Sequence, residues 1–540
     1  MKRMLLLGDE AIAQGALDAG LSGVYAYPGT PSTEITEYIQ RSKEAHERGV
    51  HSLWSANEKT AMEAALGMSY AGKRVMTCMK HVGLNVAADG FINAGITGAN
   101  GGLLVVVADD PSMHSSQNEQ DSRFYGKFAL VPVLEPANQQ ECYLATQYGF
   151  DLSEKYGTPV MIRITTRLAH SRAGVELGEP RAENELTLPA DKRQFVLLPS
   201  IARRNYQSLL GKQAAFEEES EQSPLNAYED ADNRSLGIIA CGIGYNYLME
   251  NYPDGCPHPV LKIGQYPVPR TMVKRMLDNC ERVLVLEEGA PMLEEQIRGL
   301  MDATYNISGR LDGVVPRAGE LNPNIVAQAL AMEIQPGMEK PQIVQPRPPE
   351  LCKGCPHIDS YNALNEALSD LEPGRVFSDI GCYTLGALEP FNSINTCVDM
   401  GASITMAKGA ADAGLFPAVA VIGDSTFTHS GMTGLLDAVI ENTPITVMIV
   451  DNETTGMTGG QTSSARGKLE DICKGIGVPE DHIIVVEPLR KNHEQNIDVI
   501  KRELYHRGVS VIIERRECIQ TAVVSIKLAK EAKAKKEENA

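Results

Sequence analysis

Short apolar segments alternate with longer segments of helical periodicity along most of the chain. Within the first 180 residues, apolar runs that end near Gly, Asp or Pro occur at 23–27, 74–78, 103–107 and 159–164. A helix is predicted between the first two runs, with Asn57 as its N-cap. Strands that alternate with crossover helices are typical of a parallel sheet covered on both faces. The pattern therefore predicts a doubly wound α/β domain over residues 1–180.

Two further regions repeat this alternation. One covers residues 235–340, with predicted strands at 237–240 and 282–288, and the other covers residues 350–526, with predicted strands at 418–424, 445–452 and 509–513. At roughly 100–200 residues per domain, a chain of 540 residues has room for three such domains. We therefore expect an α/β protein of three doubly wound domains.

The segments outside these regions differ in composition. Residues 181–234 contain acidic runs and few apolar residues at a steady period, so we interpret them as an acidic linker or surface arm. Four prolines between Pro341 and Pro349 indicate an extended tether. The Lys, Glu and Ala residues of 527–540 predict a charged, solvated tail.

Charge and composition exclude several classes of partner. The chain has 50 basic and 70 acidic residues, a net charge of −20, and only 5% aromatic residues, which argues against nucleic-acid binding. No apolar run is long enough to span a bilayer, so no membrane association is expected. The 11 cysteines are odd in number and dispersed, which favours a reducing cytoplasm over a disulfide framework.

A candidate metal–diphosphate motif follows two of the predicted strands. Gly423, Asp424 and Ser425 end one strand, and Asn452 ends the next, 28 residues after Asp424. If the two strands are neighbours, both polar side chains emerge at the carboxyl edge of the sheet, where such sheets bind ligands. We expect a loop at 426–431 and then a helix at 432–441. A Gly-Asp pair alone is commonly just a turn, but carboxylate and carboxamide oxygens at this spacing favour Mg²⁺ shared with a diphosphate.

This arrangement resembles the diphosphate-binding motif of thiamine diphosphate enzymes, in which a Gly-Asp pair precedes an Asn by a similar distance. The resemblance implies that Asp424, Asn452 and the carbonyl of Thr454 bind Mg²⁺. Ser425 stands where that motif more usually has a second glycine, so the local turn can differ.

Thiamine chemistry also needs an acidic residue in a dry pocket, which hydrogen-bonds the aminopyrimidine ring and comes from a second α/β domain in this enzyme class. Glu58 is the candidate, because it opens the predicted helix of the first domain directly after Asn57. A glutamate in a first helical turn commonly does no more than compensate the helix dipole, and that alternative stays open.

Several motifs together resemble the large subunit of indolepyruvate ferredoxin oxidoreductase. They are the segments 8–13, 27–32, 57–59, 79–85, 108–120, 352–357 and 381–386, followed by the Gly-Asp-Ser motif. The resemblance implies oxidative decarboxylation of an aryl pyruvate to an aryl acetyl-CoA, with coenzyme A as co-substrate and electrons passed singly to ferredoxin or a similar carrier. It also implies a small (beta) partner subunit in a dimer of chains or a heterotetramer. Thiamine diphosphate is expected between the first and third domains, within one chain or across a dimer.

The same resemblance assigns residues to the site. Glu58 would activate thiamine, while Gly29 and Thr30 would contact the cofactor. The residues expected to line the substrate end are Tyr27, Pro28, Pro31, Ser32, Lys80, His81 and His114. For the two histidines, a purely structural role is an open alternative.

Four cysteines match the positions that hold an iron–sulfur cluster beside thiamine in related 2-oxoacid ferredoxin oxidoreductases. They are Cys352, Cys355, Cys382 and Cys518, and the hypothesis is one 4Fe-4S cluster. A structural zinc site and unliganded thiols are the alternatives. The large subunit of the family usually ends in a ferredoxin-like module, but no cysteine follows Cys518, so that module is expected to be absent or supplied by another protein.

Two other functions remain open at this point. A non-oxidative thiamine diphosphate-dependent decarboxylase would use Glu58, Asp424 and Asn452 without a cluster. A non-catalytic subunit could retain the fold alone. The sequence does not identify the preferred 2-oxoacid or the electron acceptor.

Overall fold

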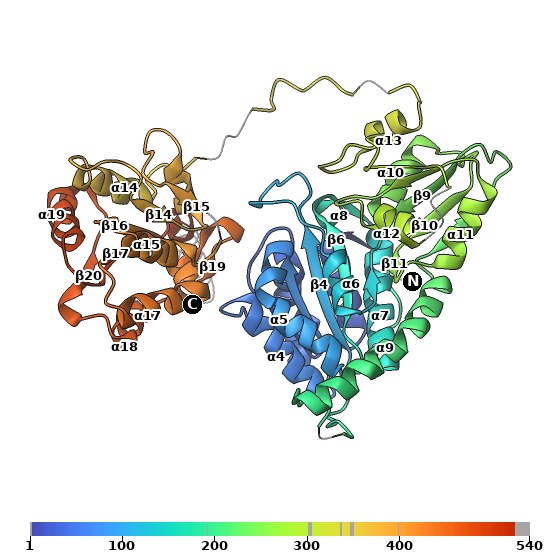
Figure 1. The fold of residues 1–540 in the computed structure, drawn as a ribbon, viewed down its shortest axis with the longest axis horizontal. Coiled ribbons are helices and arrows are strands. Elements are labelled where there is room, and N and C mark those ends of the chain that lie inside the picture. The colour runs from blue at the N-terminus through green and yellow to red at the C-terminus, as the bar shows by residue number, and fades with distance from the viewer. Residues whose placement is uncertain are drawn as a thin grey trace, which may run out of the picture. The chain divides into compact units, whose positions relative to one another are not determined.

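The computed structural model describes residues 3–523 except 192, 301–304, 335–336, 346–349 and 398. The chain divides into two compact units, Met1–Met338 and Glu339–Ala540 (Figure 1). The expected charged tail at 527–540 and the end of the proline-rich tether lie outside the described residues. Across the described part of the chain, no helix combines the length and apolarity that a membrane span requires.

The first unit begins with the predicted α/β domain. Its sheet has the order β11 (Gln265–Tyr266), β5 (Val133–Leu134), β6 (Val160–Thr165), β4 (Leu103–Asp109), β3 (Val75–Lys80) and β2 (Gly23–Ala26), with only the β11–β5 pair antiparallel. The chain starts in β1 (Arg3–Leu7), which pairs with β7 (Arg172–Glu176). The helices are α1 (Gly8–Asp18), α2 (Thr33–Arg41), α3 (Lys43–Arg48), α4 (Glu58–Tyr70), α5 (His81–Thr97), α6 (Arg123–Ala129), α7 (Gln139–Tyr156) and α8 (Thr166–His170).

The sheet is covered on both faces, as the apolar strands predict. Along β4, Leu104 and Val106 join the core that contains residues of α1, α2 and α7, whereas Leu103 and Val105 join the core that contains residues of α4 and α5. Successive side chains of a strand point to opposite faces. A central strand with helices on both sides therefore needs a continuous apolar run, which is why the sequence pattern located it.

The middle domain belongs to the same unit. Its sheet has the order β13 (Ile307–Ser308), β12 (Val283–Leu286), β9 (Gly237–Cys241), β10 (Val260–Ile263) and β8 (Ala227–Glu229). Its helices are α10 (Ile243–Asn251), α11 (Arg270–Asn279), α12 (Met292–Leu300) and α13 (Pro323–Ala329). Because β11 follows β10 and then pairs with β5, this domain contributes an edge strand to the first sheet.

Residues 181–234, expected to form an acidic linker or arm, instead contain the 23-residue helix α9 (Pro199–Glu221) and the edge strand β8 (Figure 1). The buried residues of α9 are Leu209, Phe216 and Ser220. The hydroxyl of Ser220 donates a hydrogen bond to the backbone oxygen of Gln265 in β11. So few buried positions in a long polar helix leave only a weak periodic signal in the sequence.

Buried ion pairs join the two domains of this unit. Arg163 donates hydrogen bonds to Asp109 (2.7 Å), to Glu135 (2.5 Å) and to the backbone oxygen of Glu288 in the middle domain (2.8 Å). Arg123 likewise pairs with Asp121 and with Glu287 of the middle domain. Both arginine side chains are buried, so the carboxylates around them are needed to balance their charge.

The second unit contains the third predicted α/β domain. Its sheet is entirely parallel, in the order β15 (Thr396–Cys397), β14 (Val376–Ser378), β16 (Ala418–Gly423), β17 (Ile445–Asp451), β21 (Ser510–Arg515) and β20 (Ile483–Val486). One face carries α15 (Ala402–Asp412), α17 (Met432–Ile440) and α18 (Leu469–Ile476), and the other carries α14 (Pro356–Ala367) and α19 (His493–Leu504). The hairpin of β18 (Thr454–Thr455) and β19 (Gln461–Thr462) follows β17.

Candidate active site

The two strands that precede the candidate metal ligands are neighbours, as expected. β16 and β17 pair in parallel with Gly423 opposite Val450, so Asp424 and Asn452 both follow at the carboxyl ends of adjacent strands. Asp424, Asn452 and Thr454 are all buried. The spacing in the sequence therefore places Asp424 and Asn452 at the same edge of the sheet.

The segment after Asp424 differs from the expected loop at 426–431. A helix begins at Asp424, continues as a π-helical turn over Phe427–Gly431, and leads directly into α17. Phe427 is fully buried, and the hydroxyl of Thr428 donates to the backbone oxygen of Ser425 (3.1 Å). The buried aromatic side chain and the local hydrogen bond hold the segment helical. The free N–H groups of a helix start here, at the same edge as the candidate metal ligands, and such groups bind phosphate well.

Asp424 carries a buried oxygen with nothing to satisfy it. Its Oδ2 has no hydrogen-bond partner among the described residues. Burial raises the pKa of Asp424 to about 7, although a hydrogen bond with Ser463 and the nearby backbone oppose the shift. A cation at Oδ2 would supply the missing partner and stabilise the ionised form, so this carboxylate fits Mg²⁺.

His357 orients the Asn452 amide. The Nδ2 group of Asn452 lies 3.4 Å from Nε2 of His357. Oδ1 of Asn452 accepts a hydrogen bond from the backbone N–H of Thr454 (3.2 Å). Burial lowers the pKa of His357 to about 4, so its ring is neutral and Nε2 can accept the amide proton. Asn452 therefore keeps its oxygen directed away from His357, where a second lone pair can bind a cation.

The four predicted cluster cysteines gather beside this edge. The backbone N–H of Cys518 donates to the backbone oxygen of Asn452 (3.1 Å), and a Cβ on Gly456 would lie 3.1 Å from Sγ of Cys382. Burial raises the pKa of Cys355 and of Cys382 to about 11, and the charges of the other cysteines add to both shifts. Such mutual effects require the thiols to be close.

Their spacing is wider than one zinc ion needs. Sulfurs that share a tetrahedral zinc at about 2.3 Å lie about 3.8 Å apart. Among the residues that the structure describes, no three of the four sulfurs lie within 4.8 Å of one another. The four thiols are therefore not arranged as the ligands of a single zinc ion.

Glu58 is the first residue of α4, in the other unit. Asn57 caps the helix by accepting a hydrogen bond from the backbone N–H of Thr60 (2.8 Å), as predicted. The Glu58 side chain is only 4% exposed. It lies against Gly83 of α5, where a Cβ would come within 2.8 Å of the Glu58 carboxyl carbon. Close packing against a glycine thus fixes the carboxylate in a dry environment.

The loop expected to face the cofactor and substrate is held by its own hydrogen bonds. The hydroxyl of Ser32 donates to the backbone oxygen of Gly29 (2.8 Å), and the backbone N–H of Gly29 donates to the hydroxyl of Thr33 (3.0 Å). Ser115 bridges from the next loop, because its hydroxyl donates to the backbone oxygen of Thr30 (3.3 Å). The other predicted lining residues of the loop, Tyr27, Pro28 and Pro31, are buried.

Lys80 connects this loop to Glu58. Its ammonium donates to the backbone oxygen of Ser115 (2.9 Å), and a Cβ on Gly29 would lie 3.2 Å from its Cδ. Burial lowers the pKa of Lys80, and the charges of Asp110 and Glu58 oppose that shift. The structure therefore brings Lys80, the 27–32 loop and Glu58 together.

His81 and His114 lie in different environments. Nδ1 of His81 accepts from the backbone N–H of Asp110 (3.3 Å), and its Nε2 lies 3.2 Å from the backbone oxygen of Asn118. Both ring nitrogens of His81 thus contact the backbone, and burial lowers its pKa. His114 is exposed, and its Nε2 lies 3.3 Å from the carboxylate of Glu320 in the middle domain.

Some residues of the site were not singled out from the sequence. Asp110, at the end of β4, accepts hydrogen bonds from the backbone of Ser115 and from the hydroxyls of Ser116 and Thr166. Burial alone would raise the pKa of Asp110. These hydrogen bonds and the charge of Lys80 lower it by more, so the pKa of Asp110 lies below its ordinary value. Its position after an apolar strand was the available signal. Gly83 and His357 lie within the motif segments 79–85 and 352–357, but their roles depend on the packed neighbour, which the sequence does not show.

Comparisons with known proteins identify thiamine diphosphate-binding domains in both units. The model of the pyruvate flavodoxin/ferredoxin oxidoreductase thiamine diphosphate-binding domain matches residues 14–227, and that of the thiamine pyrophosphate enzyme C-terminal binding domain matches residues 379–513. A solved 2-oxoglutarate:ferredoxin oxidoreductase from Magnetococcus marinus aligns with 61% of this chain at a TM-score of 0.51 and 18% identity. The aligned region covers 65% of that chain, and the likeness confirms the α/β fold class.

Curated relatives extend over nearly the whole chain. The indolepyruvate oxidoreductase subunits IorA of Archaeoglobus fulgidus and Pyrococcus abyssi are each 39% identical over 96% of this chain and 86% of their own length. The 2-oxoglutarate synthase subunit KorA of Archaeoglobus fulgidus is 24% identical over 55% of this chain. The chain therefore belongs to the family of the indolepyruvate oxidoreductase subunit IorA, an enzyme subunit built from thiamine diphosphate-binding domains.

Proposed function

We propose that this chain is the thiamine diphosphate-binding subunit of an enzyme that oxidatively decarboxylates aryl pyruvates to aryl acetyl-CoA and passes the electrons to a ferredoxin-type carrier. The observation that carries the proposal is the buried, unsatisfied oxygen of Asp424 at the same sheet edge as Asn452, whose backbone bonds Cys518 of the four-cysteine group. The names of the IorA relatives support indolepyruvate-like substrates and a partner subunit.

Asp424, Asn452 and the Thr454 carbonyl would hold Mg²⁺, and the helix start at Asp424 would donate backbone N–H groups to the diphosphate. Bound thiamine diphosphate supplies a carbon nucleophile that attacks 2-oxoacids and accepts electron density after loss of carbon dioxide. Burial keeps water from competing for the Asp424 oxygen.

Glu58 would exchange a proton with the aminopyrimidine ring. Its burial and its contact with Gly83 keep the carboxylate in one position. Lys80 would place a positive charge near the 27–32 loop, where it can attract the carboxylate of a 2-oxoacid. Asp110 binds the backbone of Ser115, and Ser115 in turn binds Lys80, so both act as positioning residues for Lys80 and the 27–32 loop.

The cysteines favour oxidative over non-oxidative chemistry. A decarboxylase that releases an aldehyde needs no electron acceptor beside the cofactor. Here Cys518 is joined by a backbone hydrogen bond to Asn452, and Cys382 lies against Gly456, so a cluster bound by these thiols would lie next to the diphosphate edge. No three of the four sulfurs, all in the described part of the chain, lie as close together as the ligands of a single zinc, and four cysteines are the usual ligands of a four-iron cluster.

Iron, sulfide and zinc content per chain tests the proposal on protein purified without oxygen. We expect about four irons with matching sulfide, the composition of one 4Fe-4S cluster. Cys382→Ser should lose that iron, while Cys256→Ser, which removes a half-exposed thiol in the other unit, should keep it. Zinc in place of iron, or equal iron in both variants, would contradict the cluster.

The substrate class is tested with the partner subunit present. Carbon dioxide release should be fastest from indolepyruvate or phenylpyruvate and slowest from 2-oxoglutarate. A preference for 2-oxoglutarate would reject the aryl pyruvate assignment without affecting the thiamine site.

A further inference from the structure

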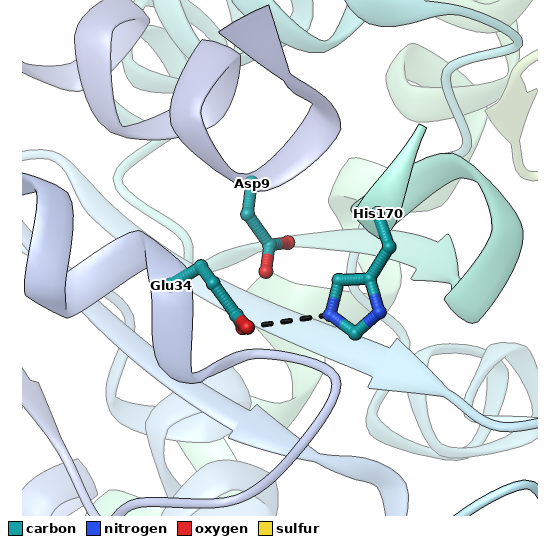
Figure 2. A group of neighbouring side chains, drawn as sticks. All are labelled: Asp9, Glu34 and His170. Carbon is teal, nitrogen blue, oxygen red and sulfur yellow. Dashed lines mark ion pairs between the residues drawn. The ribbon is translucent and has the colours of Figure 1, made fainter. Parts of the chain in front are cut away.

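Three metal-ligating side chains meet in the first unit, and none of them is used in the proposed reaction. Asp9 is on α1, Glu34 is on α2 and His170 ends α8 (Figure 2). One ligand atom of each lies within 4.8 Å of those of the other two. In Figure 2, the Asp9 carboxylate points into the space between the Glu34 carboxylate and the His170 ring.

Asp9 is the residue that demands an explanation. It is 0% exposed, and in the described part of the chain no N–H or O–H group donates a hydrogen bond to either oxygen of the ionised carboxylate. An isolated carboxylate in such a position is costly, because burial removes its water and nothing replaces it. The carboxyl therefore needs either a proton or a cation.

The neighbours of Asp9 make a cation the better partner. Glu34 brings a second carboxylate, and it stays ionised because the hydrogen bond with His170 lowers its pKa. Burial raises the pKa of Asp9 well above its usual range, and the charge of Glu34 and a hydrogen bond in which a protonated Asp9 would donate to Glu34 add to that shift. Nε2 of His170 lies 3.5 Å from Oε2 of Glu34, so this one side chain partners only one of the two carboxylates.

The group lies just beneath the protein surface. The side chains of Glu34 and His170 are partly exposed, whereas Asp9 and the Oε2 atom of Glu34 are buried. Glu34 also lines an open surface pocket of about 290 Å³, whose other lining residues are Glu10, Glu37, Tyr38, Arg41 and Ser42. Glu37 pairs with Arg41, and Glu10 lies 3.8 Å from Arg172, so the carboxylate of Glu34 is the one left to attract a cation at this pocket.

We infer that Asp9, Glu34 and His170 form a binding site for a divalent first-row transition metal ion such as Mn²⁺ or Zn²⁺. Two carboxylates and one imidazole suit these ions, and the two negative charges balance the ion. Water from the pocket side would complete the coordination.

The ion would connect three separate elements next to the 27–32 loop. Glu34 directly follows Thr33, whose hydroxyl holds the backbone N–H of Gly29. Fixing Glu34 to Asp9 and His170 would therefore secure the start of α2 and the base of that loop. The role is structural, and it stands whether or not the proposed reaction is correct.

Mn²⁺ binding to the full-length chain tests the inference, with thiamine diphosphate absent and Mg²⁺ in excess. Mg²⁺ competes for sites made of oxygen ligands alone, such as Asp424, but competes poorly where an imidazole is a ligand. Thiolates compete weakly for Mn²⁺, so the cysteines contribute little. Free Mn²⁺ is counted by electron paramagnetic resonance after equilibrium dialysis.

The wild type should bind one more Mn²⁺ per chain than Asp9→Asn or His170→Gln, and Mn²⁺ should raise the melting temperature of the wild type but not of these two variants. His258→Gln, which removes a histidine of the middle domain outside the group, should bind as the wild type does. His170 is partly exposed, so His170→Gln gives a result even if Asp9→Asn does not fold. Equal Mn²⁺ in the wild type and His170→Gln would overturn the site and leave a protonated Asp9 in its place.

Discussion

Gly83 limits where the Glu58 carboxylate can lie, and replacing it gives a sharp test of Glu58. A Cβ at position 83 would come within 2.8 Å of both Cγ and Cδ of Glu58. Ordinary carbon contacts begin near 3.4 Å, so the carboxyl carbon has to move by about 0.6 Å or more. Because Glu58 is a side chain, the fold can absorb Gly83→Ala by displacing the very group that the proposed chemistry needs.

The size of the rate loss expected for Gly83→Ala follows from how strongly catalysis depends on the position of a reacting group. A misplacement of about 1 Å in a reacting group costs on the order of 100-fold in rate. We therefore expect Gly83→Ala to slow proton exchange at C2 of bound thiamine, and turnover, by about 10- to 100-fold. Binding of Mg²⁺ and diphosphate should change little, since their ligands are in the other unit.

Gly67→Ala is the matched control. Gly67 is an exposed residue of α4, the helix that Glu58 opens, and a Cβ there meets nothing within 4 Å. That substitution should leave exchange unchanged and stabilise the protein by about 0.4–1 kcal/mol. Exchange is measured by NMR after rapid quenching in D₂O, with the partner subunit present. Wild-type exchange in a folded, cofactor-bound Gly83→Ala protein would refute the role given to Glu58.

Three further predictions concern the metal, the cluster and the domain junction. Mg²⁺ binds only the ionised carboxylate of Asp424, whose pKa is raised to about 7. The apparent Mg²⁺ affinity should therefore fall about tenfold per pH unit below pH 7 and level off above it. Titration calorimetry with thiamine diphosphate would detect this, and a flat profile would contradict the raised pKa. Cys352→Ser should abolish bound iron but leave thiamine diphosphate binding intact, and unchanged iron would reject its role as a ligand. Arg163→Met leaves Asp109 buried without its arginine and leaves Glu135 with only Arg123 and Tyr266, so the first unit should lose about 3–5 kcal/mol in urea denaturation. An unchanged transition would contradict that pairing.

The sequence predicted best those features that depend on local pattern. Strands such as β4 and β17 are continuous apolar runs because helices cover both their faces. The helix at Glu58 was predictable from its Asn57 cap, and the pairing of Asp424 with Asn452 followed from the order of adjacent strands. In each case the physical cause acts over a few residues or over one strand crossover.

Features that depend on distant packing were not predictable. Only a few residues of α9 are buried, so its polar sequence suggested a linker rather than a helix. The turn after Asp424 is helical because Phe427 enters the core, which the sequence pattern does not show. Asp9 and His170 are far apart in the sequence, and only the folded first domain brings them together.

The most direct test of the central claim is the product of one anaerobic reaction with indolepyruvate. The mixture contains this chain with its partner subunit, thiamine diphosphate, Mg²⁺, coenzyme A and a viologen dye as electron acceptor, and Glu58→Gln is run beside the wild type. The account predicts an acyl-CoA in equal amount to carbon dioxide, with two dye molecules reduced for each, and no product from Glu58→Gln. Release of an aldehyde without dye reduction would contradict it.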